Sequence, residues 1–256
     1  MSSKELATIT GITPTAYYRF TSGALTTDSS ANGHTLTDIG DPAEDASGVF
    51  GGAVVLDTND AYSAADHANF QPTGAFTIGA WVKSTVTGAT HYIFQSYSQN
   101  TNVAGITMYL STAEKLAILL GRNTGAVNNT DYKSVVGVST TLTNGSWHFC
   151  VFTWDTSYIR IYVDGVLDTA AVSWANAPGY AATNYVRVGC RNRTGTNEQF
   201  FVGSLDDVFL INGTALSADQ IAGIYWGTKS INGVGMSGIK TFNGLARASI
   251  KTFNGI

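Results

Sequence analysis

The chain has 256 residues, a formal net charge of −4 and a charged fraction of only 12%. This length exceeds the usual size of a domain, although all-β sandwiches of this size often form one domain. Glycine is abundant, and this composition favours short strands joined by turns over long helices. No stretch has the length of a membrane span, and the first ten residues lack the apolar core of a signal peptide, so we expect a soluble protein without membrane insertion.

The first half of the chain contains short apolar runs separated by polar, glycine-containing segments. Residues 28–41 are polar and show no hydrophobic period, which predicts a long ordered loop. The apolar runs are rich in β-branched and aromatic residues, as strands are. The predicted strands are residues 16–21, 53–56, 75–83, 92–97, 106–110 and 116–120, with a weaker one at 135–138.

The stretch from Trp147 to Trp154 is almost continuously apolar, which is typical of a strand buried on both faces. We therefore expect both tryptophans in the interior and this strand at the centre of its sheet. Asp164-Gly165 then separates two strand-like runs, and Asp-Gly in this position predicts a tight hairpin turn. Three consecutive antiparallel strands follow from this pattern.

The last part of the first 226 residues combines strands with one helix. Strands are expected at residues 187–189 and 200–202, with a loop at 191–198 between them, and again at 203–211. Ser217 and Gln220 form the sequence pattern of a capping box, and Leu216 and Ile221 occupy the positions of a hydrophobic staple. A short helix is therefore predicted to begin at Ser217.

Cys150 and Cys190 lie in apolar, strand-like surroundings and are expected to be buried free thiols, with a disulfide as the less favoured alternative.

Three stretches occur in the order AFTIGAWVKS, the Trp-His strand that leads to IYVDGVL, and GSLDDVFLINGTALSADQIAGIY. In sequence and in order they resemble the concanavalin A-like lectin/glucanase superfamily, in its laminin-G-like (pentraxin-like) branch. The resemblance covers roughly residues 16–225. It implies an all-β fold, a two-sheet antiparallel jelly-roll sandwich with one short C-terminal helix, in a domain of residues 1–226.

Residues 227–256, which we call the repeat segment, repeat one pattern three times. KSINGV, KTFNGL and KTFNGI recur at a spacing of eleven residues, and each is a short β-prone run closed by Asn-Gly, which predicts a series of β-hairpins. Such segments resemble the ends of some tailed-phage virion proteins. We therefore assign assembly contacts to the lysines and large apolar residues of this segment: Lys229, Ile239, Lys240, Phe242, Ile250, Lys251 and Phe253.

Charge is distributed unevenly between the two parts. The repeat segment holds three lysines, one arginine and no acid, so residues 1–226 carry about −8. Four basic residues spread over thirty make a weak footprint for nucleic acid, and an acidic protein partner is at least as well favoured.

Catalytic motifs are missing from the sequence. Glucanases of the resembled superfamily carry alternating Glu-x-Asp-x-Glu carboxylates on one strand, and this chain has no such alternation. It also lacks Gly-x-Ser-x-Gly, His-Glu-x-x-His, a phosphate-binding loop and cysteines at zinc spacing. The sequence therefore indicates a protein that is not an enzyme.

A charged pair, Asp206-Asp207, lies inside an apolar strand, where carboxylates need a cation or several hydrogen-bond donors. The resemblance implies that Asp28, Asn32 and His34, which follow the first strand, lie near this pair and help to hold a structural Ca²⁺ ion, which takes six to eight oxygen ligands. The alternative is that these carboxylates cap turns through backbone amides.

Glycan recognition requires aromatic rings and hydrogen-bonding groups that share one surface. The candidates are polar-loop and strand-end residues: Tyr92, Tyr97, Trp174, Tyr180, Tyr185, Arg191 and Arg193. The preferred interpretation is a non-catalytic structural or binding protein of a phage virion, made in the host cytoplasm. Its partners would be other virion proteins, copies of itself or host-surface glycans. A free carbohydrate-binding lectin module and, less favoured, a divergent glycoside hydrolase are the alternatives.

Overall fold

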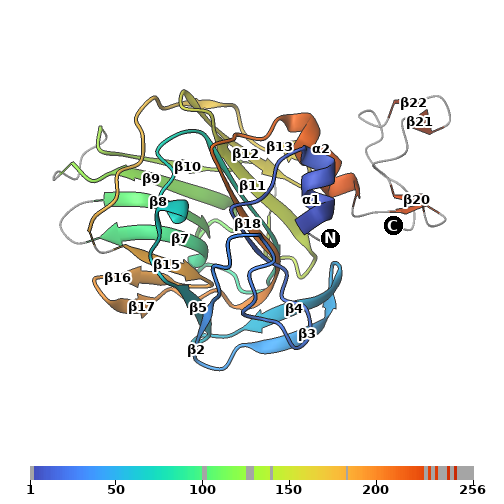
Figure 1. Cartoon of the computed structure of the whole chain (residues 1–256), viewed down its shortest axis with the longest axis horizontal. Coiled ribbons are helices and arrows are strands. Elements are labelled where there is room, and N and C mark those ends of the chain that lie inside the picture. The colour runs from blue at the N-terminus through green and yellow to red at the C-terminus, as the bar shows by residue number, and fades with distance from the viewer. Residues whose placement is uncertain are drawn as a thin grey trace.

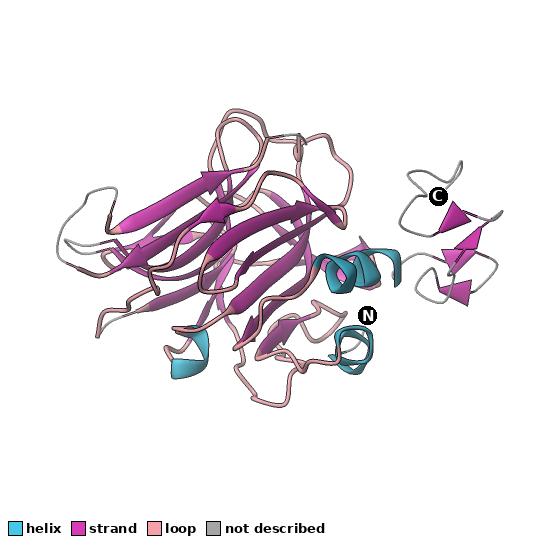
Figure 2. Ribbon diagram, turned by 90° about the horizontal axis from the view of Figure 1, so that it is seen from above, coloured by secondary structure: helices cyan, strands magenta, loops and turns pink. Residues whose placement is uncertain are grey.

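The computed structural model confirms an all-β sandwich of two antiparallel sheets (Figure 1). It describes residues 3–99, 103–124, 130–138, 141–182 and 184–227, together with 230–231, 234–235, 241–242 and 245–246. Two α-helices, α1 (Ser3–Thr10) and α2 (Ala218–Gly227), lie side by side at one end of the molecule (Figures 1 and 2), and a short 3-10 helix, η1 (Ala68–Phe70), lies in a connection. No helix in the described part of the chain is both long and apolar enough to cross a membrane.

The larger sheet has nine strands in the order β13-β12-β11-β6-β18-β4-β3, with β1 paired to β18 and β14 paired to β12. β18 is central because it pairs with β6 along one side and with both β4 and β1 along the other. The strands are β1 (Ala16–Tyr18), β3 (Ala43–Gly48), β4 (Gly51–Leu56), β6 (Phe76–Lys83), β11 (His148–Trp154), β12 (Tyr158–Val163), β13 (Val166–Leu167), β14 (Val172–Ser173) and β18 (Gly203–Asn212).

The second sheet has seven strands in the order β10-β9-β8-β7-β15-β5-β2. Its strands are β2 (Thr37–Ile39), β5 (Ala61–Ala64), β7 (His91–Gln99), β8 (Val103–Leu110), β9 (Leu116–Arg122), β10 (Tyr132–Val136) and β15 (Tyr185–Val188). A separate hairpin, β16 (Arg191–Arg193) with β17 (Thr196–Glu198), follows β15. Residues 191–198 were expected to be a loop, and that prediction is wrong because Thr194 and Gly195 adopt the positive φ values of a two-residue hairpin turn.

Two apolar clusters hold the fold together. The first lies between the two sheets and is built from side chains that point inward from both of them, including Phe76, Phe152 and Met108. The second covers the outer face of the nine-stranded sheet, where Leu6 of α1 and Ile221 of α2 pack over it. The central strands β6, β11 and β18 of this sheet are therefore buried on both faces, which explains the continuous apolar sequence of β11.

The predicted central strand is confirmed, but only one of its tryptophans is interior. β11 pairs with β6 on one side and β12 on the other, and Trp154 is 1% exposed. Trp147 precedes the strand and is half-buried, with its indole nitrogen donating to the Ser47 carbonyl at 3.1 Å. The expectation that Trp147 lies in the interior is therefore wrong.

The local turn and cap predictions are confirmed. Asp164 and Gly165 both have positive φ values, 52° and 80°, between β12 and β13. Ser217 and Gln220 exchange hydrogen bonds between side chain and backbone at 2.9 and 3.2 Å, which is the capping box at the start of α2. Both cysteines are buried and free. The helix α1 was not predicted.

Two units of the repeat segment contain hairpins, as their Asn-Gly dipeptides predict. β19 (Ser230–Ile231) pairs with β20 (Val234–Gly235), and β21 (Thr241–Phe242) pairs with β22 (Leu245–Ala246). The third unit lies outside the described residues. So do Lys229, Ile239, Lys240, Ile250, Lys251 and Phe253.

Candidate functional site

The outer face of the seven-stranded sheet gathers aromatic and cationic side chains from three adjacent strands and from β16. Tyr97 on β7 is directly opposite Tyr185 on β15, and Tyr92 on β7 is opposite Tyr109 on β8. Residues that are paired across antiparallel strands point to the same face. Arg191 of β16 lies over this face, and we call these five residues the tyrosine–arginine face.

The rings of this face are stacked rather than scattered. Tyr92 and Tyr109 lie 5.2 Å apart with an interplanar angle of 15°. The guanidinium carbon of Arg191 lies 5.6 Å from the Tyr92 ring, and that of Arg187 lies 5.6 Å from the Tyr185 ring. Cation–π contacts of this kind hold both groups in place. The stacked side chains are half-buried and remain accessible from solvent, whereas Tyr97 of the same face is only 4% exposed.

A buried amide pair anchors the β16–β17 hairpin on this face. Gln95 of β7 donates from Nε2 to the Asn192 carbonyl at 2.9 Å and accepts from the Asn192 amide at 3.0 Å. Both residues are buried, so each polar group needs such a partner. Arg191 then donates to Gln199 at 2.9 Å and lies 3.5 Å from the Glu198 carboxylate. The hairpin thus fixes the position of the Arg191 guanidinium.

Burial raises the pKa of two phenols of this face, those of Tyr92 and Tyr97. It raises the pKa of Tyr97 to about 12, although the positive charge of Arg191 partly offsets this effect. Each of these two phenols therefore stays a hydrogen-bond donor at neutral pH beside aromatic surface, and flat rings with neighbouring donors suit the apolar faces and hydroxyls of sugars.

The structure brings together most, but not all, of the predicted ligand residues. Arg193, at the exposed end of β16, lies close enough to Tyr97 for its charge to affect that phenol. Trp174 is instead part of the core, and its carbonyl accepts from the Trp154 indole at 2.7 Å. Tyr180 donates to the Pro72 carbonyl at 3.2 Å, away from this face. Sequence reasoning missed Tyr109 and Arg187, although both alternate with core residues along their strands.

Asp28 is held by hydrogen-bond donors of its own loop. Its Oδ1 accepts from the Tyr17 amide at 3.0 Å and the Ser30 amide at 2.8 Å. Its Oδ2 accepts from the Ser30 hydroxyl at 2.8 Å and the His34 amide at 2.7 Å. This is the capping arrangement that stood as the alternative to calcium.

The other two loop residues of the expected calcium site also have structural contacts. Asn32 donates from Nδ2 to the Thr15 carbonyl at 2.8 Å. The His34 ring packs 4.8 Å from Phe70 and forms a 2.9 Å hydrogen bond with Asn69. Each therefore ties the long loop to the sandwich.

Asp206 and Asp207 lie together on the outer face of the nine-stranded sheet, beneath its apolar cover. Consecutive strand residues normally point to opposite faces, but a bulge follows Asp206, and Asp207 has a φ of 48°. Asp206 accepts from the Val49 amide at 2.8 Å, and Asp207 accepts from the Tyr17 hydroxyl at 2.6 Å. Burial raises the pKa of both carboxyls.

These acids do not fit a calcium ion in the structure. Among the described residues no three His, Cys, Asp or Glu side chains form a group that could hold a metal. The oxygens of Asp28 already accept four hydrogen bonds from donors, whereas calcium takes six to eight oxygen ligands. The donor set therefore favours the capping role.

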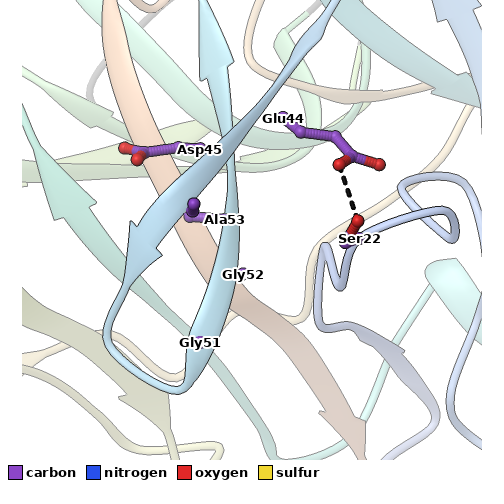
Figure 3. Close-up of a pocket in the computed structure, with 7 residues that line it drawn as sticks. Ser22, Glu44, Asp45, Gly51, Gly52 and Ala53 are labelled. Atoms are coloured by element: carbon purple, nitrogen blue, oxygen red, sulfur yellow. Dashed lines mark hydrogen bonds between the residues drawn. The ribbon is translucent and has the colours of Figure 1, made fainter.

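A hollow lies beside the β3–β4 hairpin (Figure 3). It has a volume of about 300 Å³ and is lined by Ser22, Glu44, Asp45, Ala46, Gly51, Gly52 and Ala53. Glu44 points toward Ser22 and accepts its hydroxyl hydrogen bond at 2.7 Å, while Asp45 points the other way across the strand. The hollow is therefore flanked by one carboxylate and by glycine backbone.

The comparisons with known proteins agree with this architecture. The sequence model of the concanavalin A-like lectin/glucanases superfamily matches residues 57–222, so the chain belongs to this superfamily. No curated protein sequence matches the chain.

Similar solved structures include one domain of an arabinanase and two toxin binding domains. Domain 4 of AbnA, an extracellular arabinanase from Geobacillus stearothermophilus, solved with arabinotriose, is similar with a TM-score of 0.63 and 18% identity over 83% of this chain and 98% of that one. The botulinum neurotoxin serotype G binding domain has a TM-score of 0.63 and 18% identity over 83% of this chain. The binding domain of Paraclostridial Mosquitocidal Protein 1 has a TM-score of 0.66 and 12% identity over 85% of this chain. This chain spans 50% and 52% of those two toxin domains, and at these identities the likeness shows the fold.

Proposed function

We propose that this protein is a non-catalytic binding module that recognises glycans through its tyrosine–arginine face. The observation that carries the proposal is the convergence of three half-buried tyrosines, the buried Tyr97 and the half-buried Arg191 on one outer sheet face. Stacked rings offer apolar area at little cost in conformational entropy, and the phenols and the guanidinium offer directional donors. Sugars present apolar ring faces and hydroxyls that match this combination.

The structural neighbours support a binding role. The arabinanase domain was solved with arabinotriose, and another neighbour is a botulinum neurotoxin DC binding domain in complex with synaptotagmin II. The arabinanase domain is matched over 98% of its length, so an isolated domain of this size and fold suffices for sugar binding in that protein. We extend the same class of ligand to the present chain.

The positions of its carboxylates support a non-catalytic role. Glycosidases need two carboxyl groups that flank one sugar bond. Glu44 and Asp45 are adjacent in sequence but point to opposite sides of β3 (Figure 3). Asp206 and Asp207 point the same way but are 0% and 3% exposed, so a polysaccharide does not reach them.

The setting that we propose is a virion, with the jelly roll exposed and the repeat segment in contact with other virion proteins or further copies of the chain. The support is that three basic Asn-Gly units recur every eleven residues and that two of them contain hairpins. Electron microscopy of the purified protein and of particles labelled with an antibody against it tests this setting. Label on capsids or fibres supports it, and label that never coincides with particles leaves the free lectin module as the better account.

A panel of immobilised oligosaccharides, with arabinotriose among them, tests glycan binding. Ligands that bind the full chain should bind Tyr185→Ala and Arg191→Ala at least tenfold more weakly. Tyr158→Ala is the matched control, because Tyr158 is also an exposed tyrosine under an arginine, with Arg160 5.4 Å from its ring, but on the other sheet. Binding that is equally weakened in the control, or no binding to any member of a broad panel, would contradict the proposal.

A further inference from the structure

Both sheets end at the same side of the sandwich. β2 is the last strand of the seven-stranded sheet and β3 is the last strand of the nine-stranded sheet. Only residues 40–42 separate them in the chain, so the two edges lie close together, as Figure 1 shows at the lower side of the molecule. Within the described residues, β2 pairs only with β5 and β3 pairs only with β4. Each strand therefore presents an open edge.

This side of the molecule is rich in acidic residues, although Lys83 of β6 lies 4.0 Å from Asp45 of β3. Residues 20–82 contain eight Asp or Glu and no Lys or Arg. Four of these acids, Asp38, Asp41, Glu44 and Asp57, are exposed on or beside β2 and β3, and we call them the acidic edge. Asp57 directly follows β4, whose Val55 pairs with Ala43 of β3. The acidic edge therefore places four like charges along two open strands without an intervening cation in the sequence.

An open strand edge pairs readily with another strand, and like charges along it repel an identical acidic edge. A basic strand has the complementary charge. Ala43, Glu44 and Ala46 of β3 are exposed, and Glu44 also lines the 300 Å³ hollow on the face of the β3–β4 hairpin. The edge thus offers backbone hydrogen-bonding groups and negative charge in one place.

The repeat segment has the complementary properties. It carries four basic residues and no acid, and its described backbone forms two-stranded hairpins. Lys229 immediately precedes β19, and Lys240 immediately precedes β21. A lysine therefore accompanies each short strand that could extend a sheet by edge addition.

The repeat segment follows α2, whose Tyr225 lies against the Gly165 turn between β12 and β13, where an added Cβ would come within 3.0 Å of the Tyr225 side chain. The Tyr225 ring also stacks on Trp81 of β6 at 5.7 Å, and Trp81 lies 6.5 Å from Phe50 at the turn of the β3–β4 hairpin. The segment therefore begins over the outer face of the nine-stranded sheet, whereas the acidic edge lies along β2 and at the start of β3. Charge complementarity pairs the repeat segment with the acidic edge, and a head-to-tail contact between copies satisfies it.

We propose that the acidic edge of one copy binds the basic repeat segment of a second copy, which gives a head-to-tail assembly. The proposal rests on the assembly role given above to the repeat segment, but it does not depend on glycan binding. The contact adds strands of the repeat segment to the β2 or β3 edge while its lysines face Asp38, Asp41, Glu44 and Asp57.

Charge exchange between full-length chains tests the proposal. One variant reverses the acidic edge with Asp38→Lys, Asp41→Lys, Glu44→Lys and Asp57→Lys, and another reverses the repeat segment with Lys229→Glu, Lys240→Glu and Lys251→Glu. In sedimentation velocity, the parent should form oligomers that dissociate in high salt, and each variant alone should be monomeric. An equimolar mixture of the two, or one chain carrying all seven changes, should assemble again. Lys115→Glu, which reverses a lysine outside both the repeat segment and the acidic edge, should assemble as the parent does.

Each outcome bears on the proposal. A parent chain that stays monomeric, variants that assemble as well as the parent, or a mixture that stays monomeric would each overturn it. Melting curves and glycan binding of the same variants show whether they are folded. If neither the parent nor any variant binds a glycan, the proposed function is contradicted but the assembly proposal is not, because assembly is measured separately.

Discussion

The hydroxyl of Tyr17 donates a 2.6 Å hydrogen bond to the carboxylate of Asp207, which joins the first strand of the sandwich to its central strand β18. The contact exists because the bulge after Asp206 turns Asp207 onto the same face as Tyr17. Arg19 lies 4.0 Å from the same carboxylate oxygen. A buried acid that a sequence-based interpretation assigns to a metal is thus held by a phenol and an arginine.

Tyr17→Phe should destabilise the fold by about 1–3 kcal/mol, because it removes a buried hydrogen bond to a carboxylate. Chemical denaturation measures the loss. Tyr158→Phe removes the hydroxyl of an exposed tyrosine and should change stability by less than about 0.5 kcal/mol. Equal effects of the two changes would show that the Tyr17–Asp207 bond contributes nothing specific.

Asp206→Asn should flatten the dependence of stability on pH. Burial raises the pKa of Asp206 in the folded protein, so the folded state holds this proton more tightly than the unfolded state does. The stability from Asp206 is therefore complete below the ordinary carboxyl pKa of about 4 and is lost as the pH rises through the higher folded value.

Asparagine keeps the acceptor for the Val49 amide without a charge, so the variant should match the parent at low pH and exceed it at neutral pH. Denaturation at a series of pH values tests this expectation. Asp41→Asn, which changes an exposed acid, should follow the parent curve. An Asp206→Asn variant that is less stable than the parent at neutral pH would argue for a charged role.

Trp154→Ala should cost about 3–5 kcal/mol, because it empties a large site in the core between the sheets. Trp147→Ala should cost clearly less, since Trp147 is half-buried and its indole donates to a loop carbonyl. Thermal or chemical denaturation of both variants compares them under one condition. A larger loss of stability for Trp147→Ala than for Trp154→Ala would contradict the assignment of Trp154 to the core and of Trp147 to its margin.

The melting temperature should not change with added calcium or with a chelator, because hydrogen-bond donors already surround Asp28. Asp28→Ala should lower the melting temperature in both conditions, since it leaves backbone amides of the loop without their acceptor. A melting temperature that rises with calcium in the parent and not in Asp28→Ala would restore the calcium interpretation.

The sequence was informative where a local pattern determines a local structure. Asp164-Gly165 predicts its turn because few dipeptides tolerate two positive φ values, and Ser217 predicts its helix start because the capping box is formed within four residues. The apolar run ending in Trp154 predicts a strand covered on both sides. It does not show that Trp147 stops short of the core, because that depends on where the β3–β4 hairpin lies.

The candidate site was only partly predictable, for a related reason. Tyr92, Tyr97 and Tyr185 could be named as aromatics near polar loops, but their common face depends on which strands pair and in what register. Trp174 had the same local features and belongs to the core. The positions of Asp206 and Asp207 depend on a bulge, which a regular alternation of strand residues does not reveal.

The most direct test of the account is calorimetric titration of the full chain with the oligosaccharide that binds best in the panel. Saturable binding to the parent should weaken at least tenfold, about 1.4 kcal/mol, in Arg191→Ala and in Tyr109→Ala, while Tyr158→Ala binds as the parent does. Unchanged affinity in both variants of the tyrosine–arginine face, with all proteins folded, would contradict the claim that this face binds the glycan.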